Sequence, residues 1–192
     1  MKVMTVLRQI TLMPMLAAVL SGPAMAQVLV KPTGSEIAFT TRQMGVPVEG
    51  RFGRFTAQLA FDPKAPDAGK VSLAIDTASA RFGSAELDVE VVKPGWLSSA
   101  MFPQAVFTSS RIKATGPGRF EVTGKLAIKG SEREIVVPVS LQQQGSAGTA
   151  TGTFTVKRLD YKIGEAEWAD TSLLAGDVIV RFKLVLTGLP PP

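Results

Sequence analysis

Apolar and polar residues alternate one by one near the C-terminal end of the chain. One set of alternate positions carries Val178, Val180, Phe182, Leu184 and Leu186, and the other carries Asp177, Ile179, Arg181, Lys183 and Val185. Because successive side chains of a strand point to opposite faces, this period of two predicts a β-strand with one buried face and one partly polar face.

Similar runs recur from residue 27 onward, and turn-rich stretches such as 62–69 separate them. Strands are predicted around residues 37–41, 52–61, 71–75, 106–113, 120–128, 135–141, 151–156 and 178–186. The apolar positions change parity between Phe52 and Phe55, which predicts a bulge or bend at Gly53. Pro138 predicts an edge or a bulge, because proline has no N–H to donate to a neighbouring strand. Residues 142–150 are expected to form a polar loop.

The region 84–93 departs from this pattern. Leu87 and Val91 have helical spacing, Ser84 is a candidate N-cap, and the residues after it are acidic. Pro94 and Gly95 end the pattern. One short helix is therefore predicted among the strands.

About eight antiparallel strands joined mostly by short turns must protect their edges, and closure into a barrel does so. The prediction is an all-β, extended, eight-stranded antiparallel barrel of the lipocalin type. Such a barrel is either packed solid or holds one small hydrophobic ligand. The ten phenylalanines and two tryptophans could fill this interior or line it, and periodicity leaves both alternatives open.

The first 26 residues have the form of a secretory signal peptide. Lys2 and Arg8 precede an apolar run, and Ala24-Met25-Ala26 supplies the cleavage pattern. Export to the periplasm is the expectation. Removing these two cations lowers the net charge from +5 to +3. Residues 27–192 are expected to form a single domain, with 189–192 as a flexible tail.

The absence of His and Cys excludes the common nucleophile systems, histidine acid–base catalysis and the usual zinc sites. Acidic clusters at Glu86–Glu90 and Glu165–Asp170 are more typical of solvated surfaces than of a catalytic pair. No catalytic residue, metal ligand or cofactor is predicted. The basic residues are dispersed, which argues against nucleic acid as a partner.

Several short motifs, in this order, resemble the YceI-like family. They are Gly50-Arg51-Phe52-Gly53-Arg54-Phe55, Phe61-Asp62-Pro63, Ile75-Asp76, Asp88, Phe102-Pro103 with Phe107 and Ser109, Val122–Gly130, and Arg158-Leu159-Asp160-Tyr161 with Ile163-Gly164. The chain departs from the family at Lys162, where many members have glycine, and in its lack of histidine.

The resemblance implies a lipocalin-like barrel that sequesters or carries an isoprenoid lipid, either a polyprenyl phosphate or an isoprenoid quinone. The candidates for tail contact are apolar residues, most of them at the alternate positions that the strand pattern predicts to face inward. They are Phe39, Phe52, Phe55, Leu59, Phe61, Leu73, Ile75, Leu87, Trp96, Phe107, Leu126, Ile128, Phe154, Trp168, Phe182 and Leu184. For each one, simple core packing is the alternative. Trp168, in a loop, is expected to cover a barrel end or a cavity mouth, or else to plug the core. Arg42, Arg51 and Arg54 are the headgroup candidates.

The second hypothesis is a ligand-free periplasmic stress or interaction protein. The resemblance suggests a membrane cytochrome of the b type as its partner. Transient membrane contact and a homodimer are both compatible with the sequence, which specifies neither.

Overall fold

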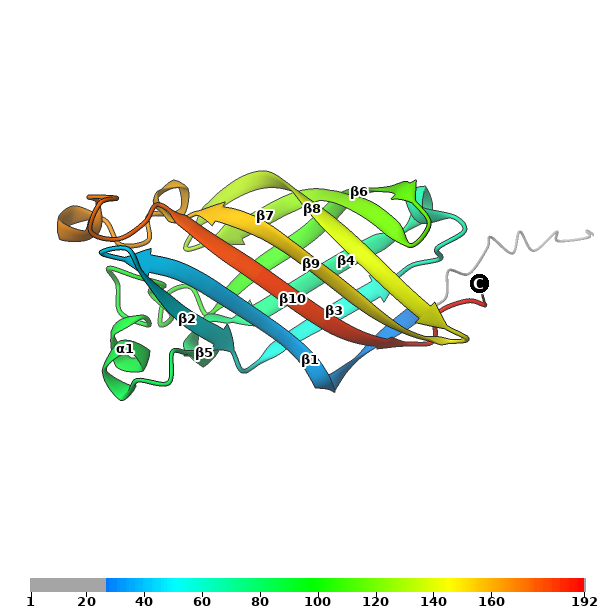
Figure 1. Cartoon of the computed structure of the whole chain (residues 1–192), viewed down its shortest axis with the longest axis horizontal. Coiled ribbons are helices and arrows are strands. Elements are labelled where there is room, and N and C mark those ends of the chain that lie inside the picture. The colour runs from blue at the N-terminus through cyan, green and yellow to red at the C-terminus, as the bar shows by residue number, and fades with distance from the viewer. Residues whose placement is uncertain (1–26, 192) are drawn as a thin grey trace, which may run out of the picture.

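Eight antiparallel strands close into a barrel within residues 27–191, the part of the chain that the structure, a computed structural model, describes (Figure 1). The strands of the ring are β1 (Gln27–Gln43), β3 (Phe55–Ala60), β4 (Lys70–Asp76), β6 (Gln104–Gly116), β7 (Arg119–Ile128), β8 (Ser131–Gln144), β9 (Ala147–Lys157) and β10 (Asp177–Thr187). Pairing of β10 with β1 closes the ring. The predicted fold class is confirmed. The predicted signal peptide, residues 1–26, lies outside the described residues.

Strand β1 has different partners along its length. Its first residues, Gln27 and Val28, pair with β3, whereas residues 37–43 pair with β2 (Val46–Phe52). The two-residue β5 (Ala80–Arg81) then extends β2. The chain passes from β2 to β3 through the bend predicted at Gly53, whose N–H donates to the Ser79 carbonyl. The barrel is therefore widened at the end where β2 lies.

The helix α1 (Ala85–Glu90) lies at this widened end (Figure 1). It falls within the predicted region 84–93, and Ser84 occupies the N-cap position. The Ser84 side chain makes no capping hydrogen bond; the Asp88 carboxylate instead accepts one from the Phe82 N–H. Short 3₁₀ helices span Pro66–Ala68, Thr77–Ser79, Arg158–Tyr161 and Ala166–Trp168. None of the described helices is long and apolar enough to cross a membrane.

Strands β8 and β9 are joined by a tight hairpin, so the loop predicted over residues 142–150 is wrong. The strands run to Gln144 and from Ala147, and Gly145, with a positive φ of 59°, lies in the turn between them. Gln142 and Gln144 lie on the exposed face of β8, where polar side chains do not oppose pairing. Earlier in β8, Pro138 directly precedes Val139, the first residue of β8 that pairs with β9. Proline has no N–H to donate to a neighbouring strand, so this position at the end of the ladder suits it.

The tail predicted to be flexible is partly packed. Leu189 is 2% exposed and belongs to the main core cluster, and its N–H donates to the Ser146 carbonyl. The Gln143 side-chain amide donates to the Pro190 carbonyl. The prediction of a flexible tail is therefore wrong for Leu189 and Pro190, because an apolar side chain past the last strand covers the end of the core.

Candidate functional site: two apolar cavities inside the barrel

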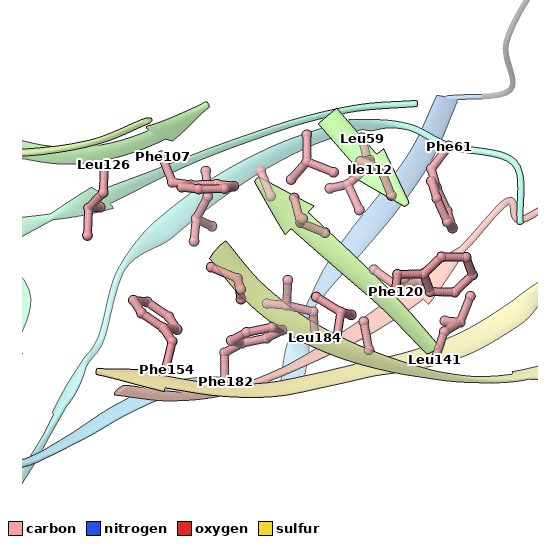
Figure 2. Close-up of a pocket in the computed structure, with 18 of the residues that line it drawn as sticks. Leu59, Phe61, Phe107, Ile112, Phe120, Leu126, Leu141, Phe154, Phe182 and Leu184 are labelled. Carbon is pink, nitrogen blue, oxygen red and sulfur yellow. The ribbon is translucent and has the colours of Figure 1, made fainter. Parts of the chain in front are cut away.

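The barrel encloses an apolar cavity, called here the barrel cavity (Figure 2). Its volume is about 140 Å³, on a scale where one water molecule needs about 10–15 Å³. Every lining residue is apolar: Ala57, Leu59, Phe61, Val71, Leu73, Ile75, Ala105, Phe107, Ile112, Phe120, Val122, Leu126, Val137, Val139, Leu141, Ala150, Phe154, Phe182, Leu184 and Leu186. The interior is thus neither packed solid nor open to polar groups.

Large side chains line this cavity without filling it because some of them lie against glycines. A Cβ atom built on Gly152 would be 2.5 Å from the Phe182 ring, its cross-strand partner, and one built on Gly124 would be 2.6 Å from the Phe107 ring. Each ring therefore occupies the space that the side chain of any residue other than glycine would need at that position. The absence of a side chain on these two glycines therefore makes room for the two rings beside the cavity.

An aromatic pair closes the barrel cavity at the end where the described chain begins and ends. The rings of Phe61 and Phe120 meet edge to face, with their centroids 5.2 Å apart (Figure 2). Phe61 directly follows Ala60, the residue that pairs with Gln27. Leu189 packs into the same core cluster.

A second cavity, called here the helix-end cavity, lies beside α1 and has a volume of about 180 Å³. It is lined by Phe39, Thr41, Gln43, Val48, Phe52, Phe82, Leu87, Glu90, Val91, Trp96, Leu97, Ile128, Val156, Arg158, Ile163, Leu174, Val178 and Val180. Unlike the barrel cavity, it has four polar lining residues: Thr41, Gln43, Glu90 and Arg158.

The two cavities lie end to end along the barrel. On β10, Val178 and Val180 line the helix-end cavity, and the next inward residue, Phe182, lines the barrel cavity. The same change occurs between Leu126 and Ile128 on β7 and between Phe154 and Val156 on β9. Apart from Phe182, which packs against the main core cluster, these boundary side chains pack in or against one buried cluster that lies between the cavities.

Arg158 is 2% exposed and is held entirely by backbone carbonyls. Its guanidinium donates five hydrogen bonds of 2.5 to 2.9 Å, to the carbonyl oxygens of Ile163, Gly164, Trp168, Leu174 and Ala175. Burial lowers the pKa of Arg158. These bonds fold the segment between β9 and β10 around its first residue and over the barrel end.

Glu90 is the other charged residue of the helix-end cavity. The Lys93 ammonium donates a 2.5 Å hydrogen bond to one carboxylate oxygen, and the Trp96 indole N–H donates one of 3.1 Å to the other. Chiefly the bond from Lys93 lowers the pKa of Glu90, so the carboxylate is ionised at neutral pH. Trp96 also packs on Trp168, with ring centroids 5.8 Å apart.

The structure divides the predicted tail-contact residues between the cavities. Leu59, Phe61, Leu73, Ile75, Phe107, Leu126, Phe154, Phe182 and Leu184 line the barrel cavity, and Phe39, Phe52, Leu87, Trp96 and Ile128 line the helix-end cavity. Phe55 packs against the core and lines a polar groove on the outside, and Trp168 packs on Trp96. Neither residue lines the barrel cavity or the helix-end cavity. Their contact with a lipid stays a prediction.

The three predicted headgroup arginines lie on the outside. The Arg42 guanidinium donates to the Gly45 carbonyl, and Arg54 forms an ion pair of 2.7 Å with Asp76. Arg51 and Arg54 line the polar groove between β1 and the bend at Gly53. None of the three lines either apolar cavity, and their role in headgroup binding stays a prediction.

Sequence reasoning missed several lining residues. Ile112, Phe120 and Val122 belong to predicted strands, and their parity could have placed them inside. Thr41 and Gln43 follow Phe39 at alternate positions and so face inward, but their polar side chains did not suggest an apolar cavity. Nothing local in the sequence distinguishes the buried Arg158 from a surface arginine. No group of three or more potential metal ligands occurs within residues 27–191.

Comparison with known proteins identifies one family. The family model described as "YceI-like domain" matches residues 29–186. A UPF0312 protein from Ectopseudomonas mendocina is 31% identical over 121 residues, which are 59% of this chain and 63% of that protein. The match thus spans less than two thirds of that relative.

Solved structures share the barrel. BcnA from Burkholderia cenocepacia superimposes with a TM-score of 0.79 at 38% identity, covering 81% of this chain and 98% of that one. A polyisoprenoid binding domain from Saccharophagus degradans, implicated in plant cell wall breakdown, gives a TM-score of 0.67 at 17% identity, covering 84% and 98%. At that identity, the likeness concerns the fold alone.

Proposed function

The chain belongs to the YceI-like family, and on that premise we propose that it binds an isoprenoid lipid, a polyprenyl phosphate or an isoprenoid quinone, inside its barrel. The observation that carries the proposal is the pair of apolar cavities aligned along the barrel axis. A domain of the same fold is described as polyisoprenoid binding, which agrees with the proposal.

The energetics favour a carrier. A tail of about forty carbons, at about 0.8 kcal/mol per buried CH₂, represents on the order of 30 kcal/mol of transfer from water. Ordering of the tail and imperfect packing offset much of this. A bilayer also buries the tail, so the net preference between protein and membrane is small. A small preference permits both uptake and release.

One tail can occupy both cavities only if the boundary side chains move. Leu126, Phe154 and Phe182 are those that a continuous chain must displace, because each lines the barrel cavity next to a residue of the other cavity. Rotation of such side chains needs no strand to separate. We propose that the lipid itself opens this boundary and that the protein performs no chemistry on it.

The sequence of residues 1–26 supports export, so we place this activity in the periplasm. Transient membrane contact is part of the proposal. Met44 and Val46 are 68% and 63% exposed, and Leu87, Val89 and Leu173 are exposed too. Each lies within two residues of the lining of the helix-end cavity, or belongs to it. These apolar side chains would meet a bilayer where the lipid enters.

Filling the barrel cavity tests the proposal. Ala57 lines the cavity from β3, and Ala57→Phe places a ring in the space assigned to the tail. Uptake of a prenylated quinone from phosphatidylcholine vesicles should fall at least about tenfold, because overpacking costs about 1–3 kcal/mol. Thr56→Phe, on the exposed face of the same strand, is the control. Equal uptake by both variants, or no uptake by the unchanged protein, would refute a tail site in the barrel.

A further inference from the structure

The two ends of the barrel interior are closed in different ways. At the helix end, large apolar side chains such as Met44 and Val89 are exposed close to the cavity lining. At the opposite end, Phe61 and Phe120 line the barrel cavity and are only 8% and 5% exposed. This aromatic pair is called here the floor. Because the proposed function has the lipid entering at the helix end, the tail must stop at the floor.

Backbone supports the floor behind the Phe61 ring. The chain leaves Phe61 through the 3₁₀ helix Pro66–Ala68 and returns at Gly69. A Cβ atom built on Gly69 would be 3.0 Å from the Phe61 ring and 3.0 Å from the side chain of Ile112, which is 1% exposed. The Phe61 ring thus lies between the cavity and this turn, and it cannot move outward without displacing the turn.

Phe120, the other half of the floor, is held by strands on both sides. It lies near the start of β7, opposite Ala114 on β6 and Val139 on β8. Its ring meets the Phe61 ring edge to face, with the centroids 5.2 Å apart (Figure 2). Each ring therefore restricts the rotation of the other, and the floor is a rigid end to the cavity.

The floor gives the interior a fixed length. Along β7, Phe120 at the floor and Ile128 in the helix-end cavity are eight residues apart, and Val178 and Leu186 have the same spacing on β10. A strand rises about 3.3 Å per residue and tilts by about 35–45° in a barrel, so both spacings give an interior of about 20 Å along the axis. A straight tail is fully enclosed only up to this length.

Isoprene units beyond this length gain nothing from the protein. In a bilayer every unit of the tail is buried, whereas a unit that does not fit into the barrel is left in water at the helix end. Burial of apolar surface is favourable in proportion to its area. Each excess unit therefore shifts the lipid from the protein towards the bilayer.

We propose that Phe61 and Phe120 set the longest tail that the protein holds, so that it selects isoprenoid lipids by their number of isoprene units. The inference rests on the proposed function and deepens it, because it adds a length limit to the lipid class. Figure 2 shows the floor at one end of the barrel cavity and Leu126 and Phe154 at the other. Leu126 and Phe154 have a cavity on either side and can yield to a tail, whereas the floor has backbone behind it.

A series of prenylated benzoquinones that share one headgroup and differ by single isoprene units tests the length limit. An equimolar mixture in phosphatidylcholine vesicles is equilibrated with the purified protein, and mass spectrometry compares the bound quinones with those left in the vesicles. Binding relative to the vesicles should fall at least about tenfold for each unit beyond one tail length. Binding that shows no such limit would overturn the role of the floor. Binding of no member of the series would instead overturn the proposed function and the length limit together.

Variants of the floor and of the wall supply a matched comparison. Phe120→Ala opens the floor and should move the limit to longer tails by at least about one isoprene unit. Phe120→Leu keeps a buried apolar side chain, tests the same shift if the alanine variant does not fold, and should move the limit in the same direction. Phe107→Ala removes a ring from the wall of the cavity, so it should keep the limit even where it weakens binding. Glu121→Ala, on the exposed face of β7, should change neither. An unchanged limit in the folded Phe120 variants, or an equal shift in Phe107→Ala, would overturn the proposal.

Discussion

Close contacts between phenylalanine rings and glycines shape the interior residue by residue. Phe182 lies over Gly152, Phe107 over Gly124, and at the helix end Phe39 lies over Gly50, where a Cβ would be 2.3 Å from the ring. Parity along each strand predicts which phenylalanines point inward. It does not predict which residue faces each ring, because that depends on the register between strands.

Gly152→Ala should therefore lower both stability and lipid uptake. The added Cβ would lie 2.5 Å from the Phe182 ring and from the Pro138 carbonyl oxygen, and relieving this overlap moves the ring into the barrel cavity. The expected loss is about 1–3 kcal/mol in the free energy of unfolding, measured by urea denaturation. Gly95→Ala, with open space around its Cβ and no positive φ, serves as the control, and equal stability of the two variants would contradict this role of Gly152.

The pKa of Tyr161 is sensitive to the burial of the segment between β9 and β10. Burial raises the pKa of this phenol above its ordinary value of 10, with Asp160 also raising it and Arg133 opposing. The folded state therefore favours the neutral phenol. This contribution to stability is complete below the ordinary pKa and is lost as pH rises towards the folded-state value.

The chain has one tyrosine, so tyrosinate absorbance measures this pKa directly. The native protein should form tyrosinate at a higher pH than the protein unfolded in urea. Coincident titration curves would show that Tyr161 is solvated in the native state.

At the scale of elements, the segment between β9 and β10 depends on one side chain. All five carbonyls bound by the Arg158 guanidinium belong to this segment, and its Leu174 forms a bridge to Gln43. The strands were predictable because burial of one face imposes a period of two on each sequence. The packing of this segment was not, since it depends on hydrogen bonds to backbone atoms, which leave no periodic pattern. In the same way, the polar composition of residues 142–150 suggested a loop, although these residues form the end of one strand, a tight turn and the start of the next strand.

Arg158→Met should loosen this segment. The substitution keeps a long side chain but leaves five carbonyls without their donors, and a loss of about 3 kcal/mol or more in the free energy of unfolding is expected. Hydrogen exchange should rise over residues 159–176 more than in β6 or β7. Arg51→Ala, an exposed arginine on the outer groove, should change neither quantity. Unaltered exchange in Arg158→Met would contradict this organising role.

At the scale of the whole molecule, the fold was predictable and the state of its interior was not. Eight strands with short connections require closure, whatever residues fill the barrel. Whether the interior is hollow depends on how far each side chain reaches towards the axis. The interior is neither fully packed nor one continuous tunnel, because it holds two cavities of about 140 and 180 Å³ with side chains between them.

Native mass spectrometry of the purified protein tests most directly whether this interior holds a lipid. The account predicts a species heavier than the polypeptide by one prenylated lipid, whose extracted mass shows isoprene repeats. The Ala57→Phe variant should lack this species. A protein that carries the polypeptide mass alone, both as purified and after incubation with vesicles containing prenylated quinone, would contradict the account.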